Sequence, residues 1–455
     1  MPKIYPFRPI QYNAGRGDVS SLVAPPYDVL DAKGKARLLA KNGRNIVAVD
    51  LPHTPAKELG PAETYQAAGD QFRAWLADGT LERRPRPAIF AYRQTFDFGG
   101  KSHQRCGMAC SLEVVPFGPR AGGGVLPHEE TFSGPKEDRF ALMKATAIQL
   151  SPIFGLHADE RGHATALVRR VMSSRAPDLT ARLDEDNVLH EVWTIEDPAT
   201  IDQYARALEG EDVFIADGHH RYTTGMNYLK MLESHSEIGP DHPARRSMFV
   251  LIGMSDPGLV IGPTHRVLGG MSDYTFERFA SSAADILDIR PGPASPNHLE
   301  QVMRIAAALA PGGESDANVF GLYDFATERC FIAVLRVDDP LLDQFPAKPE
   351  AWRRLDVAII QYALVEGICQ PMLNRGQPVK WAFPHSVPDV IEIGKGHETG
   401  AGGGKTFRPQ LAIVVRPTPL KSVQAVSQAN QLMPQKSTFF YPKLATGLFM
   451  NPLDE

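Results

Sequence analysis

Apolar and polar positions follow two rhythms along this chain, one with helical spacing and one with the two-residue spacing of strands. Helical spacing predicts helices over Asp31–Lys41 and Pro61–Asp78, each closed by a glycine-containing stop. Strand-like runs at Ala88–Thr95 and Cys106–Val115 flank Gly99-Gly100, a dipeptide typical of tight hairpin turns. The first quarter of the chain is therefore expected to combine helices with a β-hairpin.

The remaining sequence continues this mixture of helices and short strands. Helices are predicted at about 136–150, 163–185, 196–209, through most of 271–310 and at 352–368, and strands at 187–195, 249–253, 259–262, about 318–337 and 411–415. Such alternation is typical of a mixed α+β or α/β fold. At 455 residues the chain can form several lobes, which we expect at about 1–155, 156–270 and 271–455 within one unit.

Composition narrows the class of protein. The chain has 43% hydrophobic and 22% charged residues, a composition that resembles that of soluble globular proteins. Its net charge of −5 argues against non-specific nucleic-acid binding. No apolar run approaches the ~20 residues of a membrane span, and the N-terminus lacks a signal-peptide pattern. Four cysteines are too few for a disulfide framework, and Cys106 and Cys110 are expected on one buried strand face. We therefore expect a cytoplasmic protein without membrane or nucleic-acid partners.

The most informative segment is Val213–Tyr222, where an apolar run delivers four chemically active side chains and one glycine to the start of a predicted helix. Gly218 suits a tight turn at which bare backbone N–H groups can meet a ligand, and the helix dipole adds partial positive charge there. Arg221 can grip phosphate or carboxylate, while Asp217, His219 and His220 can move protons or hold a metal. A solvated helix cap is the alternative interpretation.

Three other polar clusters carry similar chemistry. They comprise His128, Glu129, Thr131, Lys136, Asp138 and Arg139; Thr264, His265 and Arg266; and Lys436, Ser437, Thr438 and Lys443. A proline-rich stretch, Ala24–Leu30, is expected to form a rigid loop that presents Tyr27 and Asp28. Each cluster alone can be a solvated strand end, but together they predict a single cleft. The aromatic-rich segment Met433–Leu453 is expected to dock against the body of the protein.

One further stretch is similar to a phosphate-binding loop but departs from its pattern. In Thr399–Thr406 a threonine stands where the first glycine is required, and Pro409 with a β-rich run follows where a helix is needed. We interpret this stretch as a loop between strands.

The motifs together resemble a known family. Pro6-Phe-Arg8, Ala24–Val29, the His128 and Lys136 clusters, Ala216–Tyr222, Pro263–Arg266 and Met433–Thr438 occur in the order found in domain-of-unknown-function family 1015. The Asp217–Arg221 core is also similar to the ParB/sulfiredoxin-like superfamily, one branch of which is a free-serine kinase. That resemblance implies an α/β element around the turn, with phosphates held near Gly218–His220 and Arg221.

Chemistry and resemblance together predict a nucleotide-dependent phosphotransferase acting on a small hydroxylated metabolite such as free serine. ATP or ADP with Mg²⁺ would be the cofactor, with Glu129 as base and Asp217 orienting a histidine or Mg²⁺. Gly218, Arg221, Lys136, Arg139, His265, Arg266, Lys436 and Ser437 would bind the nucleotide, and Glu129, Asp217, His219 and His220 would be catalytic. Alternatives are a phosphatase, a nucleotide-binding regulatory or scaffold protein, and a metal hydrolase that uses the histidines.

Overall fold

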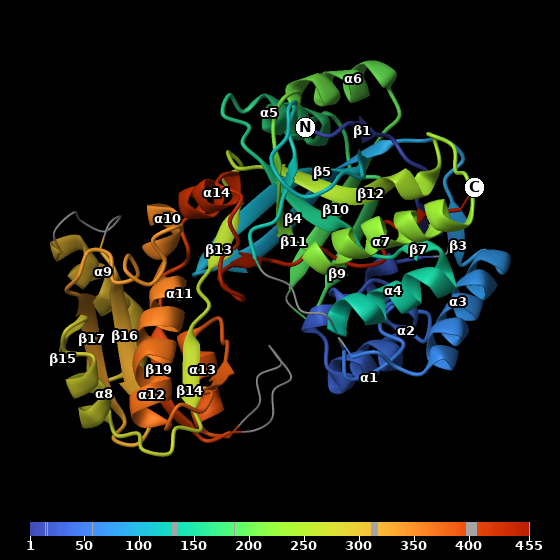
Figure 1. The fold of residues 1–455 in the computed structure, drawn as a ribbon. Coiled ribbons are helices and arrows are strands. Elements are labelled where there is room, and N and C mark those ends of the chain that lie inside the picture. The colour runs from blue at the N-terminus through green and yellow to red at the C-terminus, as the bar shows by residue number, and fades with distance from the viewer. Residues whose placement is uncertain are drawn as a thin grey trace. The chain divides into compact units, whose positions relative to one another are not determined.

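A computed structural model of the chain describes residues 1–13, 15, 17–56, 58–129, 134–185, 187–310, 317–396 and 407–454. The fold is mixed α/β, as the sequence predicts (Figure 1). The chain divides into two compact units. The first takes its described residues from 1–127, 131–260 and 440–455, and the second takes them from 128–130 and 261–439. The loop expected over Thr399–Thr406, like Thr131, lies outside the described residues.

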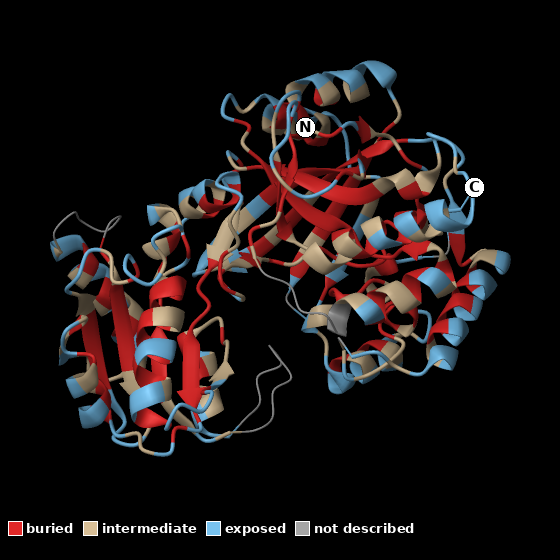
Figure 2. Cartoon of the chain, viewed as in Figure 1, coloured by how far each residue is buried: buried red, intermediate tan, exposed pale blue. Residues whose placement is uncertain are grey.

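The first unit is built on a mixed sheet whose strand order is β6-β11-β8-β12-β5-β4-β10-β9, with β1 paired to β5. Its strands are β1 (Ile4–Tyr5), β4 (Ile89–Phe98), β5 (Lys101–Glu113), β6 (Val125–Leu126), β8 (Ile153–His157), β9 (Leu179–Leu183), β10 (Val188–Ile195), β11 (Val213–Asp217) and β12 (Arg246–Gly253). Figure 2 shows most of this sheet buried, as near-continuous apolar strands require. Residues 1–155 and 156–270, expected in separate lobes, both contribute strands to it.

The predicted hairpin is confirmed. Phe98 pairs with Lys101 across Gly99 and Gly100, whose φ angles of +59° and +74° suit the tight turn that joins twisted strands. Cys106 and Cys110 lie on one buried face of β5 and belong to the same hydrophobic core cluster. The even spacing of these two cysteines therefore reflects packing.

Helices surround this sheet. They are α1 (Ala32–Lys41), α2 (Val47–Asp50), α3 (Ala62–Ala77), α4 (Gly134–Thr146), α5 (His163–Ser174), α6 (Pro198–Ala207) and α7 (His219–His235). The predicted helices at 31–41 and 61–78 are confirmed, and Asp31 caps α1 by accepting a hydrogen bond from Gly34 N–H. The prediction of a helix over 163–185 is wrong beyond Ser174. Pro177 biases the preceding residue to extended geometry, and Leu179–Leu183 pairs with β10 as a strand.

The second unit contains a sheet in the order β15-β17-β16-β19-β14-β18. Its strands are β14 (Arg266–Gly269), β15 (Leu287–Pro291), β16 (Val319–Asp324), β17 (Arg329–Leu335), β18 (Lys380–Ala382) and β19 (Pro409–Val414). Its helices are α8 (Phe276–Ser282), α9 (Leu299–Leu309), α10 (Glu350–Arg353), α11 (Asp356–Ala358), the π-helix Ile359–Cys369, α12 (Gln370–Leu373), α13 (Val387–Gly394) and α14 (Leu420–Gln428). Strand β15 interrupts the helical pattern expected over 271–310, because its edge pairs with β17.

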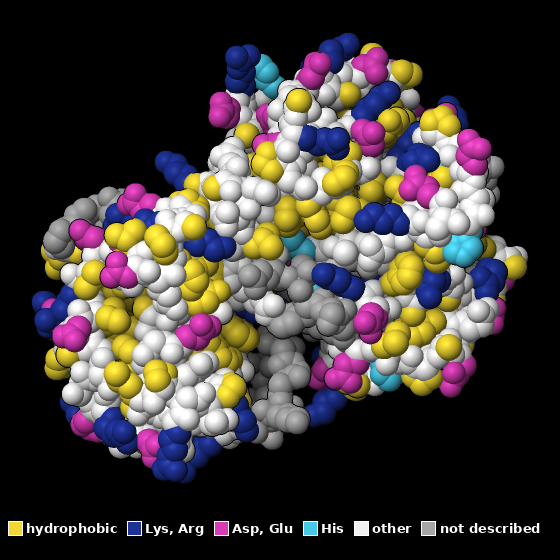
Figure 3. All heavy atoms as spheres, in the orientation of Figure 1, with side chains coloured by type: hydrophobic (Ala, Val, Ile, Leu, Met, Phe, Trp, Pro, Cys, Tyr) yellow, Lys and Arg dark blue, Asp and Glu magenta, His cyan; other side chains and the backbone are white. Residues whose placement is uncertain are grey.

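Short elements complete the description. They are β2 (Ile10–Tyr12) paired with β3 (Leu81–Arg83), β7 (Ile148–Gln149) paired with β21 (Asn451–Pro452), β13 (Val260–Gly262) and β20 (Phe439–Tyr441). No helix in the described ranges is both long and apolar enough to cross a membrane. On the face drawn in Figure 3, basic and acidic side chains are interspersed, and neither sign of charge dominates.

From Phe440 on, the C-terminal segment docks into the first unit, as its apolar load predicts, whereas Met433–Phe439 belongs to the second unit. Phe440, Leu444, Leu448 and Phe449 are at most 2% exposed. The Phe449 ring lies 5.0 Å from that of Phe90, between ring centroids, in a tilted contact with strand β4. This segment is therefore part of the core.

We expect Phe449→Ala to lower the free energy of unfolding by about 3–5 kcal/mol, because truncation leaves a cavity against β4. Urea unfolding followed by circular dichroism measures this loss. Leu59→Ala, at a side chain 55% exposed, is the control and should change stability by less than about 1 kcal/mol. Equal, small effects in both variants would contradict firm docking.

Candidate functional site

The Asp217–Arg221 stretch forms a strand-to-helix turn, as predicted. Strand β11 ends at Asp217, and α7 begins at His219. Gly218 stands between them at φ +95°, a left-handed conformation that glycine adopts at little cost. A Cβ added at Gly218 would lie 3.0 Å from the Cζ and Nε atoms of Arg221, so the guanidinium would have to shift by a few tenths of an ångström to make room.

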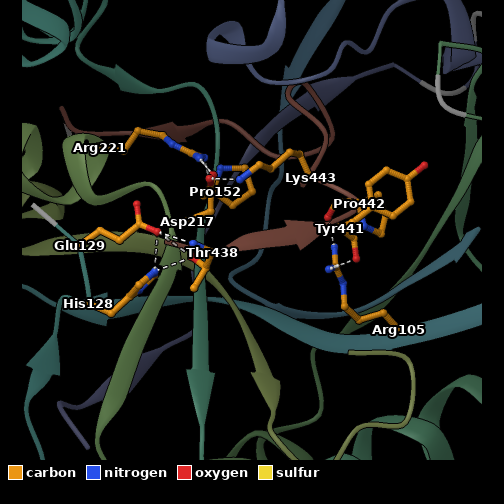
Figure 4. A network of polar contacts seen from close by, with 10 residues as sticks. All are labelled: Arg105, His128, Glu129, Pro152, Asp217, Arg221, Thr438, Tyr441, Pro442 and Lys443. Atoms are coloured by element: carbon orange, nitrogen blue, oxygen red, sulfur yellow. Dashed lines mark hydrogen bonds and ion pairs between the residues drawn. The ribbon is translucent and has the colours of Figure 1, made fainter. Parts of the chain in front are cut away.

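Asp217 is the centre of a compact ion network in the first unit (Figure 4). One carboxylate oxygen accepts from the Arg221 guanidinium and the other from the Lys443 ammonium. Arg221 also donates to the carbonyl of Pro152. The side chains of Asp217, Arg221 and Lys443 are 14%, 12% and 19% exposed. Segments more than 200 residues apart in sequence therefore share one nearly buried carboxylate.

The electrostatics of Asp217 favour its ionised form. Burial alone would raise the pKa of this carboxyl, but the charges of Lys443 and Arg221 outweigh burial and hold the pKa below its usual range. The same contact raises the pKa of Lys443 against the opposing effect of burial. Both groups therefore remain charged at neutral pH.

A second ion network surrounds Arg139, near the start of α4. Its guanidinium donates to Asp138 at 2.8 Å and to the backbone carbonyl of Asp50 at 2.6 Å, and its Cζ lies 3.9 Å from the Tyr27 ring centroid. The Tyr65 hydroxyl donates to Asp138 at 2.7 Å. Burial raises the pKa of Asp50 despite the attraction of Arg139. Arg139 therefore joins three segments of the chain, and its role in nucleotide binding stays a prediction.

Arg139 and Arg221 line one cavity of about 40 Å³, together with Tyr27 and Asp50. This volume has room for about three water molecules. Asp28 belongs to the same region, because its negative charge contributes to raising the pKa of Lys443 and that of Tyr27. Within the described part of the chain, the buried Oδ1 of Asp28 has no hydrogen-bond partner. The proline-rich loop, the α4 start and the Asp217 turn thus converge, as the sequence predicts for these three motifs.

The charges of this cluster are nearly balanced. Three cations, Arg139, Arg221 and Lys443, face the four carboxylates Asp28, Asp50, Asp138 and Asp217. His219 and His220 are partly buried at the first turn of α7. The charge of His219 contributes to lowering the pKa of Asp217. An anionic ligand here would rely on the α7 N-terminus and on partners shared with the aspartates.

The remaining predicted residues gather mostly in the second unit. There Glu129 Oε1 accepts from the N–H and hydroxyl of Thr438, each at 2.9 Å, and His128 Nε2 lies 2.8 Å from the same hydroxyl (Figure 4). Arg266 is buried and donates to the Lys436 carbonyl at 3.0 Å. Burial lowers the pKa of Arg266 to about 10, although Glu129 opposes the shift.

Ser437, Lys436 and His265 differ in their surroundings. Ser437 is buried and donates to the Pro434 carbonyl at 2.5 Å, whereas Lys436 is exposed at φ +59°. His265 is fully buried, accepts from Val415 N–H at 3.2 Å and lies 3.6 Å from Glu300. These contacts hold His265 between the end of β19 and helix α9.

Convergence of the motifs therefore occurs within each unit. Lys136 is partly buried on α4 in the first unit, with Arg139. Glu129, His265, Arg266, Lys436 and Ser437 belong to the second unit. A single cleft that joins both groups stays a prediction, as do the roles of these residues. For the described residues, no three His, Cys, Asp or Glu side chains gather as a metal site.

Sequence reasoning missed Asp50, Tyr65 and Arg105. Arg105 is 1% exposed and donates to the backbone carbonyls of Tyr441 and Pro442, directly before Lys443. Burial lowers its pKa to about 10. The sequence did carry a signal for this contact, because Arg105 begins the apolar strand run 105–112. A buried arginine is rarely without partners, so its position indicates a polar contact inside the fold.

Comparison with known proteins gives a family and distant structural neighbours. The model of a family described as "Protein of unknown function (DUF1015)" matches residues 4–358. A conserved hypothetical protein from Pyrococcus furiosus is 13% identical, with 72% of this chain and 95% of that chain covered and a TM-score of 0.31. Free serine kinase in complex with AMP is 12% identical, with 72% and 89% covered and a TM-score of 0.32.

A third solved structure, SbnI with a C-terminal truncation from Staphylococcus aureus, is 11% identical, with 72% of this chain and 84% of that chain covered and a TM-score of 0.32. None of the curated proteins matches this chain. TM-scores this low leave the chemistry of the site to be argued from this chain's own residues.

We expect Asp217→Asn to lower the free energy of unfolding by about 3–5 kcal/mol, because Arg221 and Lys443 would keep nearly buried charges without their carboxylate. Folding lowers the pKa of Asp217, so its contribution is full above the unfolded value of about 4 and is lost as the pH falls toward the folded value. The stability difference between wild type and variant should therefore shrink below about pH 4. Urea titrations between pH 2 and pH 7 measure it.

Lys443→Met provides the matched partner, since methionine keeps most of the apolar length of lysine. The double variant should be more stable than the sum of the two single effects predicts, by about 1–3 kcal/mol. Additivity of the two substitutions would show that the Asp217–Lys443 contact contributes no coupling energy.

Proposed function

This chain belongs to the DUF1015 family of proteins of unknown function, and we propose that it is a phosphotransferase that moves a phosphoryl group between a nucleotide and a small hydroxylated metabolite. The observation that carries the proposal is the turn at Gly218. There an uncapped helix N-terminus, Arg221 and Lys443 meet at one ionised carboxylate. Phosphoryl transfer depends mainly on positioned cations and dipoles, which this turn supplies.

Each group at the turn has a defined task in this proposal. Phosphate oxygens would lie against the first turn of α7, where Gly218 brings no side chain between ligand and backbone. Arg221 and Lys443 would neutralise phosphate charge while they keep contact with Asp217. Arg139, which lines the same cavity as Arg221, would add a third cation. His219 and His220 would hold or move protons beside the phosphates.

The carboxylates fit a nucleotide-bound Mg²⁺. This ion is usually held by one or two carboxylates plus substrate phosphates, so a cage of three protein ligands is not required. Asp217 is ionised, and the buried Oδ1 of Asp28 has no hydrogen-bond partner in the described structure. These two carboxylates would hold the ion, which would supply charge neutralisation at the phosphoryl oxygens.

The substrate and the base complete the proposal. Similarity of the Asp217–Arg221 stretch to the free-serine kinase branch makes serine the first hydroxylated substrate to test. Glu129 is the proposed base, and Arg266 and Lys436 are proposed nucleotide-binding residues. A phosphatase that uses the same pocket and a nucleotide-binding regulatory protein are the alternative functions.

A turnover assay separates these functions. Purified protein is incubated with ATP or ADP and Mg²⁺, with and without serine and other small alcohols, and nucleotide and phosphorylated products are measured by mass spectrometry. A phosphotransferase consumes nucleotide only when the acceptor is present. Nucleotide binding without turnover across the panel would reject the phosphotransferase in favour of the regulatory protein, and phosphate release from a phosphorylated metabolite would favour the phosphatase.

Gly218→Ala tests the turn itself. The added Cβ would press on the Arg221 guanidinium, so we expect nucleotide affinity to fall at least about tenfold in a titration by calorimetry. Gly162→Ala is the matched control, because Gly162 also precedes a helix at positive φ (+67°) but has no atom within 4 Å of the added Cβ. Both variants should lose about 1–2 kcal/mol of stability, and only Gly218→Ala should lose affinity for the nucleotide. Equal nucleotide affinity in the two variants would remove the turn from the site.

Lys436→Ala tests a predicted nucleotide-binding residue. Lys436 is exposed, so its truncation should leave the melting temperature unchanged while nucleotide binding weakens about threefold to tenfold. Unchanged affinity would reject its role as a ligand-binding residue.

A further inference from the structure

A second cavity lies in the first unit, at the family motif Pro6-Phe7-Arg8. Its volume is about 350 Å³, within the range of small-molecule sites in proteins. It has no lining residue in common with the cavity at Arg139 and Arg221. The proposed phosphotransferase chemistry therefore leaves this motif and this cavity without a role.

The charge of the cavity lining has one sign. Arg8, Arg83 and Arg246 contribute to it, and no described aspartate or glutamate does. Where the structure describes the chain, neither Arg8 nor Arg83 forms an ion pair with an acidic residue. Arg8 is held through its Nε, which donates to the Arg84 carbonyl at 3.0 Å and leaves its terminal nitrogens for other partners. Two arginines without an acidic partner in the described structure, beside a third whose acidic partner is exposed, attract an anion.

Arg246 is held in place before any ligand arrives. Its Cζ lies 3.8 Å from the ring centroid of Tyr5, and its side chain is 21% exposed. Its acidic neighbour, Asp241, lies 3.1 Å from the guanidinium. The Asp241 side chain is 96% exposed, so water screens this ion pair strongly. The aromatic contact therefore fixes the guanidinium, and binding an anion there costs little side-chain entropy.

Most of the other lining side chains are apolar and stiff. Tyr5 and Phe7 supply aromatic surface, and Pro6, Pro243 and Pro452 supply rigid rings. Such walls hold an apolar or ring-shaped body and give little to a bare inorganic ion. We infer that this cavity binds a small organic anion, in which a phosphate, sulfonate or carboxylate group on a ring or apolar body meets Arg8, Arg83 and Arg246.

A hydrogen bond links this cavity to the first. Asn451 lines it and donates to Gln149 at 3.2 Å, and Gln149 lines the cavity at Arg139 and Arg221. Gln149 also accepts from Met248 N–H at 2.7 Å. The organic anion would therefore be bound one hydrogen bond away from the proposed catalytic cluster, at a separate site.

Anilinonaphthalene sulfonate is the probe, because it joins a sulfonate to a fluorescent apolar ring system. We expect saturable binding to the full-length protein, with affinity about threefold to tenfold lower in Arg246→Gln and in Arg83→Gln. Arg83 is exposed, so its variant keeps the fold even if Arg246→Gln is less stable. Arg170→Gln, an exposed arginine of α5 outside the cavity, removes the same charge and should bind the probe as wild type does.

Competition defines the ligand class. Phenyl phosphate and benzoate test the two kinds of anionic group, and displacement by either at least tenfold more effectively than by inorganic phosphate supports an organic anion. Equal affinity of the probe for wild type and both cavity variants would overturn the site. Equal potency of inorganic phosphate would overturn the role of the apolar walls. Every measurement in this test is of binding. A failure of this anion site therefore says nothing about phosphotransferase activity, and a failure of the phosphotransferase proposal says nothing about the anion site.

Discussion

One nearly buried carboxylate holds the candidate site together. Asp217 accepts from Arg221 on its own helix and from Lys443 near the chain's end, and Arg221 reaches the carbonyl of Pro152. In a medium of low dielectric these contacts are strong, and removal of one partner leaves charge that water cannot reach. The residue before β8, the start of α7 and the C-terminal segment are therefore linked through the side chains of Asp217 and Arg221.

The site is nearly neutral, and this constrains its chemistry. Arg139, Arg221 and Lys443 face four aspartates, so there is no large surplus of positive charge to attract phosphates from a distance. A ligand must instead be recognised at close range by the α7 N-terminus and by cations already oriented by their aspartates. Preorganised dipoles of this kind cost no reorganisation when charge develops in a transition state, which suits group transfer.

Structural support for this site comes from residues that need not contact a ligand. Arg105 binds the carbonyls of Tyr441 and Pro442 and thereby places Lys443, while Phe449 packs against β4 further along the same segment. Packing of the apolar C-terminal segment therefore also brings the Lys443 ammonium to Asp217. The cavity at Arg8 and Arg246 borders the same segment through Asn451.

The sequence alone determined the local structure: the Gly99-Gly100 hairpin, helices α1 and α3, and the Asp217–Gly218 turn, because spacing, caps and glycine φ preferences act over a few residues. It misjudged 175–185, where pairing with β10 overrode helical spacing. Only the tertiary structure brought Lys443 to Asp217 and Asp50 to Arg139, and assigned Glu129 and Arg139 to different units. Contacts between segments hundreds of residues apart depend on packing and charge pairing, which no local pattern encodes.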